Sequence, residues 1–299
     1  MKLVIAGASG LIGAALVDQL SRQSHTLTLL SRTERQSKAR NQRWLKWRPG
    51  EPGEWEQALD GADGVINLAG EPIADKRWSR RQKDRLRSSR IETTRALVGA
   101  MSSAQARPKF LINASAVGYY GSRGNETVTE ASPPGNDFLA QLCLEWETEA
   151  RKSEALGTRV VLLRTGIVLA NRGGALKKML PPFKMFAGGP LGSGQQYVPW
   201  IHIEDEIGLI CFLMENQTGG AFNATAPNPV TMTEFARTLG AVLNRPAWAR
   251  VPASVLAVMV GEMADMLLAS QRVVPDAALK LGFKFKYTQL KGALLSLRL

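Results

Sequence analysis

Short apolar runs alternate with longer amphipathic stretches along the first half of the chain. The apolar runs predict buried strands, because a strand covered on both faces carries few polar side chains. The amphipathic stretches predict helices that bury one face. Strands are expected at 2–6, 26–30, 43–47, 64–70, 109–114 and 159–164, and helices at 14–22, 79–103 and 138–154. This alternation predicts an α/β fold built on a doubly wound parallel sheet.

The pattern changes after residue 165, where glycine-rich loops at 171–174 and 188–194 appear. We therefore divide the chain into a Rossmann domain at 1–165 and a smaller C-terminal lobe at 166–299, interleaved with the first. A helical element at about 250–297 ends the second lobe. The further helices are expected at 175–186, 233–243 and 253–269.

The most informative stretch joins the first strand to the first helix. It contains three glycines in a tight turn, with the spacing Gly-x-x-Gly-x-x-Gly. Glycines there let the backbone approach a pyrophosphate, whose charge is stabilised by the free N–H groups of the helix N-terminus. The predicted pyrophosphate ligands are Gly7, Ser9, Gly10, Leu11, Ile12 and Gly13.

The end of the second strand indicates which dinucleotide to expect. An acidic residue there would bind the ribose 2′-hydroxyl of NAD, whereas an arginine accommodates a 2′-phosphate. The chain has Ser31 and Arg32 at this point, and its next acidic residue is Glu34. We therefore expect NADP(H) in preference to NAD(H), with Ser31 and Arg32 among the ligands. The alternative is that Arg32 is a solvated loop charge.

The glycine turn, the Asn-x-Ala-Gly at 67–70, the Ser-Arg-Ile-Glu-Thr-Thr at 89–94, the loop at 188–194 and the Pro-Trp-Ile-His-Ile at 199–203 together resemble one family. It is the extended short-chain dehydrogenase/reductase family, or NAD(P)-dependent epimerase/dehydratase superfamily. The resemblance is greatest to its poorly characterised "epimerase family protein" subgroup, which has a C-terminal domain of unknown function. It implies a Rossmann fold and a substrate-binding C-terminal lobe.

The resemblance also implies roles for individual residues. The segment after the fourth strand would pass the cofactor, and basic residues nearby would reach its phosphate or ribose. These further cofactor ligands would be Leu68, Ala69, Gly70, Glu71, Arg85, Arg90 and Arg164. His202 would touch substrate, although a structural histidine that holds its loop is at least as compatible with the pattern.

Hydride chemistry in this superfamily uses a serine, a tyrosine and a lysine, with the tyrosine as acid/base on a substrate hydroxyl. Ser115 matches the catalytic serine, and Tyr119 and Tyr120 follow it closely. The expected Tyr-x-x-x-Lys is missing. Aligning Glu147 with the helix glutamate of the family places Leu139 and Cys143 at those positions, and a shift by one residue places Phe138 and Leu142 there.

Three interpretations of the missing dyad remain open. Another group acts as the base, with Tyr119, Tyr120, His202 and Glu71 as candidates. Alternatively, the protein binds NADP(H) as a catalytically silent sensor or regulator. The third interpretation is a hydride transfer that needs little help from a base. We favour an epimerase/dehydratase-like oxidoreductase that acts on a small or nucleotide-linked carbohydrate-like substrate.

Composition narrows the partners. The 299 residues are 44% hydrophobic, as in ordinary globular proteins, and the net charge of +12 invites a nucleic-acid interpretation. The positive residues are spread along the chain without a recognition helix or metal-ligand spacing. We therefore expect no nucleic-acid partner and no metal, and we attribute the charge to the surface and to a polyanionic ligand. A small-molecule substrate and a monomer or homodimer are expected.

Cysteine usage and hydropathy suggest a cytoplasmic protein. Cys143 and Cys211 lie far apart and are expected as buried thiols, which fits a reducing compartment. No signal peptide is expected, because glycines interrupt the first apolar run. The longest apolar stretch, 255–269, contains Glu262 and Asp265, so we expect a buried helix and no membrane partner.

Overall fold

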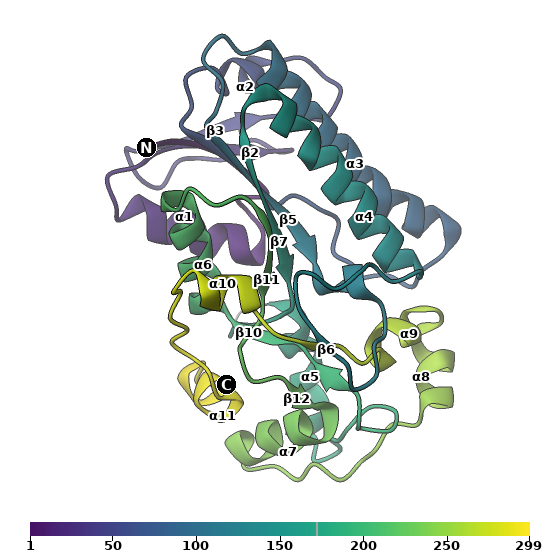
Figure 1. Cartoon of the computed structure of the whole chain (residues 1–299). Coiled ribbons are helices and arrows are strands. Elements are labelled where there is room, and N and C mark those ends of the chain that lie inside the picture. Colours follow the sequence, from purple (N-terminus) through teal and green to yellow (C-terminus); the bar gives the residue numbers. More distant parts are fainter. Residues whose placement is uncertain (172) are drawn as a thin grey trace.

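A computed structural model describes residues 1–171 and 173–299, and Arg172, in one of the glycine-rich loops, lies outside the described residues. The centre of the molecule is a seven-stranded sheet with the order β11-β7-β5-β4-β1-β2-β3, in which every neighbouring pair is parallel (Figure 1). The strands are β1 (Lys2–Ala6), β2 (Thr26–Ser31), β3 (Gln42–Lys46), β4 (Gly64–Asn67), β5 (Phe110–Ala116), β7 (Arg159–Thr165) and β11 (Gly220–Ala224). This order confirms the predicted doubly wound Rossmann fold.

The direction of winding reverses between β1 and β4. From β1 the chain builds outward through β2 and β3, then returns to β4 on the other side of β1. In open parallel sheets, the ligand crevice lies outside the carboxyl ends of the strands at this reversal. The sheet topology therefore places a crevice where β1 and β4 end.

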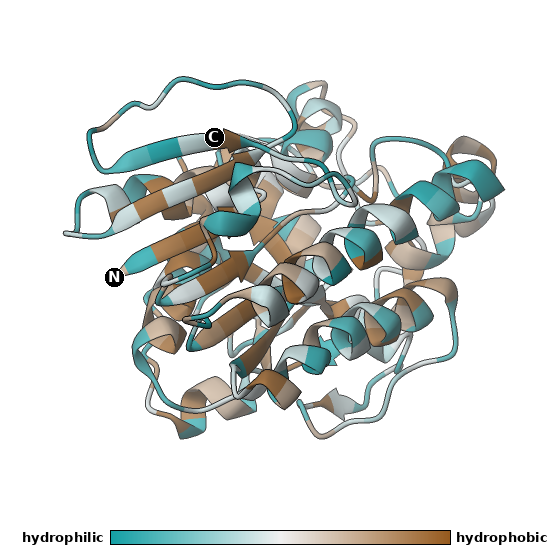
Figure 2. Ribbon diagram, turned by 90° about the horizontal axis from the view of Figure 1, so that it is seen from above, coloured by the Kyte–Doolittle hydropathy of each residue, from teal (hydrophilic) through white to brown (hydrophobic). Residues whose placement is uncertain are grey.

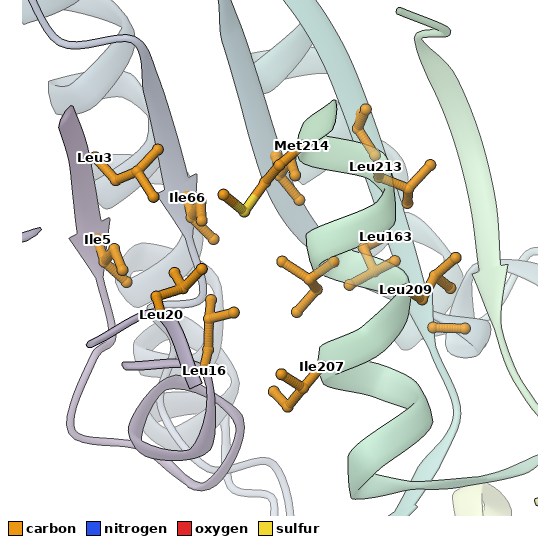
Figure 3. Packing of buried hydrophobic residues seen from close by; sticks show 14 of the residues in the cluster. Leu3, Ile5, Leu16, Leu20, Ile66, Leu163, Ile207, Leu209, Leu213 and Met214 are labelled. Carbon is orange, nitrogen blue, oxygen red and sulfur yellow. The ribbon is translucent and has the colours of Figure 1, made fainter. Parts of the chain in front are cut away.

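Helices cover both faces of the sheet. On one face, α1 (Leu11–Ser21) and α6 (Ile203–Glu215) pack their leucines and isoleucines against the strands (Figure 3). The opposite face is covered by α2 (Glu54–Gln57), α3 (Arg80–Ser103) and α4 (Phe138–Arg151), which enclose a second apolar cluster. Figure 2 shows hydrophobic residues concentrated on the central strands, and polar residues on the outer helices and loops. Burial on both faces explains why the central strands β1, β4, β5 and β7 carry mostly apolar side chains.

Most of the remaining elements form a lobe below the sheet in Figure 1. Its apolar cluster includes side chains of α5, α7 and α11. The helices of the lobe are α5 (Gly174–Lys184), α7 (Met232–Leu243), α8 (Ala253–Val260), α9 (Met263–Leu268) and α11 (Leu290–Ser296), whereas α10 (Asp276–Lys280) packs against β11 and the sheet-domain cluster of α1 and α6. Short strand pairs are β8 (Ile167–Leu169) with β10 (Trp200–His202), β9 (Tyr197–Val198) with β12 (Val230–Thr231), and β6 (Thr127–Val128) with β13 (Arg272–Val273). The 3₁₀ helices are η1 (Val117–Tyr120) and η2 (Lys152–Leu156).

The first half of the chain matches the predicted elements closely, whereas the second half departs from them. The pattern did not predict α6 and β11, which complete the sheet domain although they follow residue 165. The predicted buried helix at 253–269 is wrong. It is split at Gly261, whose φ is +63°, and the side chain of Val258 is 77% exposed. None of the described helices is long and apolar enough to cross a bilayer.

One carboxyl group is buried between α6 and the sheet. Glu206 has no exposed surface, and its Oε1 accepts a hydrogen bond of 2.8 Å from the hydroxyl of Thr165. Its Oε2 has no hydrogen-bond partner among the described residues. Burial raises the pKa of Glu206 to about 8, so the folded chain favours the protonated form.

We expect the free energy of unfolding to fall as the pH rises from about 6.5 to about 8. Over this range the folded state retains at Glu206 a proton that the unfolded chain has already released, so raising the pH favours the unfolded chain, and a single group contributes at most about 1.4 kcal/mol per pH unit. Urea denaturation of the wild type and of Glu206→Gln across this range measures the effect. The low pKa of His202, about 4, acts in the opposite direction only below this range. Equal slopes in the two proteins would contradict the assignment.

Candidate functional site

The turn between β1 and α1 is built from backbone contacts that leave no room for side chains. Gly7 has a φ of +78°, and a Cβ on it would lie 2.5 Å from the carbonyl carbon of Leu68. A Cβ on Gly13 would lie 2.2 Å from the carbonyl oxygen of Gly7. The two glycines therefore allow the turn to pack directly against the end of β4 and against the first turn of α1.

The N-terminus of α1 is uncapped and opens at the crevice. Gly10 is the N-cap residue and supplies no side-chain hydrogen bond, and the first turn contains no acidic residue. Ser9 and Gly10 are exposed, and Leu11 and Ile12 are half-buried. Free N–H groups and the helix dipole make this end of α1 suited to bind an anionic group.

The segment that follows β4 is held beside this turn. The Asn67 side chain accepts a hydrogen bond from the backbone N–H of Ala69, and the N–H of Glu71 donates to Ser89. Arg90 donates to the carbonyl oxygen of Glu71 at 3.1 Å, and its guanidinium lies 5.2 Å from the ring centroid of Trp146. Arg90 thus holds residues 68–71 in place through its hydrogen bond to Glu71.

The two predicted arginines of α3 have different environments. Arg90 also donates to the carbonyl oxygen of Leu86, and burial lowers its pKa, so it is enclosed within the protein. Arg85 is exposed, and its side chain makes no hydrogen bond or ion pair in the part of the chain that the structure describes. Of the two, only Arg85 has a freely accessible guanidinium.

A buried amide network underlies the crevice. Asn67 donates to Asn113 Oδ1 at 2.7 Å and to the hydroxyl of Thr94 at 2.9 Å. The indole of Trp146 also donates to Thr94, at 2.9 Å. This network joins the ends of β4 and β5 to α3 and α4, and full pairing of buried polar groups makes such a junction rigid.

The end of β2 carries the two residues predicted to recognise a 2′-phosphate. Ser31 is buried, and its hydroxyl accepts hydrogen bonds from the N–H of Thr33 and from Nε of Arg35, each at 3.3 Å. Arg32 is exposed, and its side chain makes no hydrogen bond or ion pair among the described residues. Ser31 therefore shapes the turn after β2, whereas Arg32 is accessible to a ligand.

The residues predicted to be catalytic belong mostly to a buried polar network. The Ser115 hydroxyl donates to Glu147 Oε1 at 2.7 Å, and Arg164 binds both oxygens of Glu147 at 2.8 Å each. Arg164 also donates to the Tyr120 hydroxyl at 2.9 Å, which in turn donates to Asn223 Oδ1 at 2.6 Å. These contacts use the donors that Ser115 and Tyr120 would need for substrate.

Burial separates the two tyrosines. Tyr120 has no exposed surface, and burial, opposed in part by Arg164, raises its pKa to about 12. Tyr119 is half-buried, with its ring centroid 3.5 Å from the guanidinium carbon of Arg164. Its hydroxyl makes no hydrogen bond in the described structure. Among the three predicted catalytic side chains, Tyr119 alone has an uncommitted polar group.

Arg164 is 3% exposed and its donors go to Glu147, Tyr120 and the carbonyl oxygen of Glu130. The expectation that it binds the cofactor directly finds no support in this arrangement. An internal ion pair satisfies the guanidinium instead, because an unpaired charge at this depth would be costly.

The positions of the missing dyad lie on one face of α4. Leu139, Cys143 and Glu147 are spaced by four residues, which supports the alignment on Glu147. A Cβ on Gly118 would touch Leu139 and lie 3.9 Å from the sulfur of Cys143, so this face packs against η1. Cys143 is buried, and burial together with Glu147 raises its pKa to about 12. This face of α4 therefore offers neither a phenol nor an amine.

His202 has a structural environment. Its Nδ1 accepts the N–H of Glu204 as the cap of α6, and its Nε2 lies 3.1 Å from the hydroxyl of Ser296. Its ring centroid lies 3.8 Å from that of Tyr287, and the residue is 1% exposed. Both nitrogens are used within the lobe, so the structure gives no support to a substrate contact and favours the structural alternative.

Sequence reasoning missed two members of the buried network. Glu130 accepts hydrogen bonds from the N–H groups of Asn223 and Ala277, and Asn223 donates to the carbonyl oxygen of Val274. The three bonds join residues that are 93, 147 and 51 positions apart in the chain. No local motif signals such pairings.

The loop after Glu71 is tied to the lower lobe. Lys178 of α5 forms a 2.7 Å ion pair with Asp75, and Arg77 donates to the carbonyl oxygen of Val258 in α8. Lys83 pairs with Glu262 beyond the end of α8. These contacts connect the crevice side of the sheet domain to the lobe.

Residues 3–225 match the family model described as the NAD dependent epimerase/dehydratase family. The chain belongs to this family. Residues 251–297 match a second model, Domain of unknown function (DUF1731). The match confirms the resemblance inferred from the motifs, including the C-terminal domain.

Relatives within the family cover nearly the whole chain. The Arabidopsis thaliana "Epimerase family protein SDR39U1 homolog, chloroplastic" is 44% identical over 98% of this chain and 86% of its own length. The Bacillus subtilis "Epimerase family protein YfhF" is 39% identical over 98% of this chain and 97% of its own.

Solved structures support the same fold. The crystal structure of human epimerase family protein SDR39U1 (isoform2) with NADPH has a TM-score of 0.89 and 35% identity, and the match covers 99% of both chains. MoeE5 in complex with UDP-glucuronic acid and NAD has a TM-score of 0.80 at 18% identity, over 100% of this chain and 98% of its own, a likeness in fold alone.

The Glu147–Arg164 pair generates a stability prediction. Arg164→Met should destabilise the fold by about 3–5 kcal/mol, because it leaves the Glu147 carboxylate buried without a partner charge. The double variant Arg164→Met/Glu147→Leu should recover much of this loss. Urea denaturation measures both.

Arg95→Ala is the control for this prediction. It removes an ion pair to Glu149 in which the arginine side chain is 62% exposed, and it should cost less than about 1 kcal/mol. If Arg164→Met cost no more than this control, the buried network would not have the structural role assigned here.

Proposed function

We propose that this chain binds NADP(H) and acts as an oxidoreductase on a small or nucleotide-linked carbohydrate-like substrate. The observation that carries the proposal is the uncapped N-terminus of α1 behind a glycine turn that admits no side chain, with the accessible Arg32 at the end of the neighbouring strand. The human relative crystallised with NADPH supports the choice of cofactor.

The residues present fit a dinucleotide. Gly7 and Gly13 allow the tight turn and its packing, and Gly10, whose Cβ position has only the Gly7 carbonyl oxygen nearby, lets the backbone approach a pyrophosphate. Ser9, together with the N–H groups of Leu11 and Ile12, would bind its oxygens. Arg32 would pair with the 2′-phosphate. Leu68, Ala69, Gly70 and Glu71 would line the adenosine side, with Arg85 as an accessible cation of α3.

When bound, the cofactor supplies or accepts a hydride at its nicotinamide ring. A hydroxyl substrate that loses a hydride must also lose a proton from its oxygen, and a carbonyl that gains one must receive a proton. We assign this transfer to the hydroxyl of Tyr119. The Tyr119 phenol is the uncommitted one of the pair, and its ring is held against the Arg164 guanidinium, whose carbon lies 3.5 Å from the ring centroid.

A second candidate function is an NADP(H) sensor without turnover. It is favoured by one specific observation: Leu139 and Cys143 give an apolar wall where the family has its dyad, and Ser115 is already bound to Glu147. Under this hypothesis the cofactor site is formed, but the side chains at the catalytic positions are not available to a substrate.

The cofactor assignment predicts a selective loss. Arg32→Ala should weaken NADPH binding by roughly 1–3 kcal/mol, the scale of a hydrogen bond to a charged group, and leave NADH binding nearly unchanged. Isothermal titration calorimetry with both nucleotides measures this. Arg22→Ala, at the far end of α1, is the control for a general loss of positive charge. Equal losses for both nucleotides in Arg32→Ala would remove the assignment.

The catalytic assignment predicts turnover that depends on Tyr119. With a panel of sugars, nucleotide sugars and simple carbonyls, NADPH consumption should be detectable in the wild type. It should fall at least about 10²-fold in Tyr119→Phe, the usual range for a lost acid/base. Tight NADPH binding with no consumption for any substrate would favour the sensor, and consumption unaffected in Tyr119→Phe would assign the proton transfer elsewhere.

A further inference from the structure

A second arginine is held in place just beyond the end of β2. Arg35 lies in the crossover between β2 and β3, and its Nε donates to the hydroxyl of Ser31 at 3.3 Å. Its guanidinium carbon lies 5.5 Å from the ring centroid of Trp44. Trp44 packs against the apolar cluster beneath α1, so its ring is anchored by the core. The guanidinium is thereby fixed on two sides.

The free edge of this guanidinium is available to a ligand. Neither terminal nitrogen of Arg35 makes a hydrogen bond in the part of the chain that the structure describes. A hollow of about 410 Å³ lies against the side chain. Its lining residues are Glu34, Arg35, Gln36, Trp44, Leu45 and Lys46.

Lys46 brings a further cation to the same place. It is the β3 partner of Ser31 in the strand register, and the next residue, Trp47, donates its N–H to the Ser31 carbonyl oxygen at 2.9 Å. Arg35 and Lys46 line the hollow together, with Glu34 as the acidic residue of its lining, and Arg32 directly follows the end of β2.

We propose that Arg35 is a second ligand of the NADP(H) 2′-phosphate, aimed by Ser31 and Trp44, and that it determines cofactor preference together with Arg32. The inference rests on the proposed function and deepens it. A phosphate monoester carries about −1.5 to −2 charges at neutral pH, more than one arginine neutralises. A planar guanidinium binds phosphate through two parallel hydrogen bonds, and a pre-positioned side chain loses less entropy on binding.

The test uses adenosine 2′,5′-bisphosphate and 5′-AMP, which differ only in the 2′-phosphate, with isothermal titration calorimetry. Arg35→Ala should weaken binding of the bisphosphate about tenfold or more, the size of a lost charge-assisted contact. It should change the affinity for 5′-AMP less than about twofold. Arg35→Lys should retain part of the affinity, because it keeps the charge but not the fork. Glu34→Gln should tighten binding of the bisphosphate, because it removes a negative charge that repels the phosphate.

Arg40→Ala is the matched control. Arg40 lies on the same crossover and is exposed, and its side chain makes no hydrogen bond or ion pair among the described residues. It should change bisphosphate affinity less than about twofold, since it alters only the general field. Ser31→Ala should weaken binding of the bisphosphate, because Arg35 loses the hydrogen bond that orients its guanidinium. Its melting temperature should stay close to that of the wild type, because the hydroxyl accepts only two long hydrogen bonds, from the Thr33 N–H and from Arg35 Nε, each at 3.3 Å.

The outcomes separate the two proposals. If the wild type binds the bisphosphate more tightly than 5′-AMP and Arg35→Ala retains the full ratio, the Arg35 assignment is overturned while the proposed function stands. Equal losses in Arg35→Ala and Arg40→Ala also overturn it, because the effect is then net charge. If the wild type binds neither NADPH nor the bisphosphate, the proposed function fails and the inference fails with it.

Discussion

The closest backbone contact in the sheet domain is also the one on which the site depends. Gly7 lies against the backbone of Leu68, and Gly13 lies against the carbonyl oxygen of Gly7. This approach brings the end of β4 beside the start of α1 and leaves the first N–H groups of that helix without a cap. A side chain at either glycine would push the two segments apart. The crevice at the sheet reversal is therefore a consequence of missing Cβ atoms.

A second constraint lies on the other side of the strand ends. Glu147 and Arg164 are buried together, and their remaining hydrogen bonds are satisfied by Ser115 and Tyr120. Because each polar group has a partner, the network is stable at this depth and holds η1 against β7 and α4. The same hydroxyls that resemble catalytic groups in the sequence act here as structural ligands of an ion pair.

The sequence predicted the features that depend on local pattern. Apolar runs located most of the sheet strands of the first half, because burial on both faces leaves a clear signal, and the glycine turn lies where it was expected, between β1 and the uncapped N-terminus of α1. The pattern did not reveal β11, whose five residues include two alanines and one glycine, or α6, which is apolar on most sides. The exposed apolar side chains of α8 contradicted the simple rule that such runs are buried.

For the candidate site, too, the sequence indicated only those residues whose positions depend on local pattern. Arg32 and the glycines could be proposed as ligands from spacing, because their places at the end of β2 and in the β1–α1 turn depend on neighbours in the chain. His202 and Arg164 could not, because a motif identifies a residue type without showing which donors are already used. Their partners, Ser296 and Glu147, are determined by tertiary packing alone.

The late arrival of β11 bears on how the protein folds during synthesis. It pairs with β7, more than fifty residues earlier, after the chain has passed through the lobe and α6. The ribosome delivers α6 first, up to Glu215, and β11 afterwards, up to Ala224. Until β11 has emerged the edge of β7 stays unpaired, a state in which open strand edges invite association with other chains. The nucleotide-binding half is thus complete in sequence long before it is complete as a folding unit, and its maturation waits for the second half of the polypeptide.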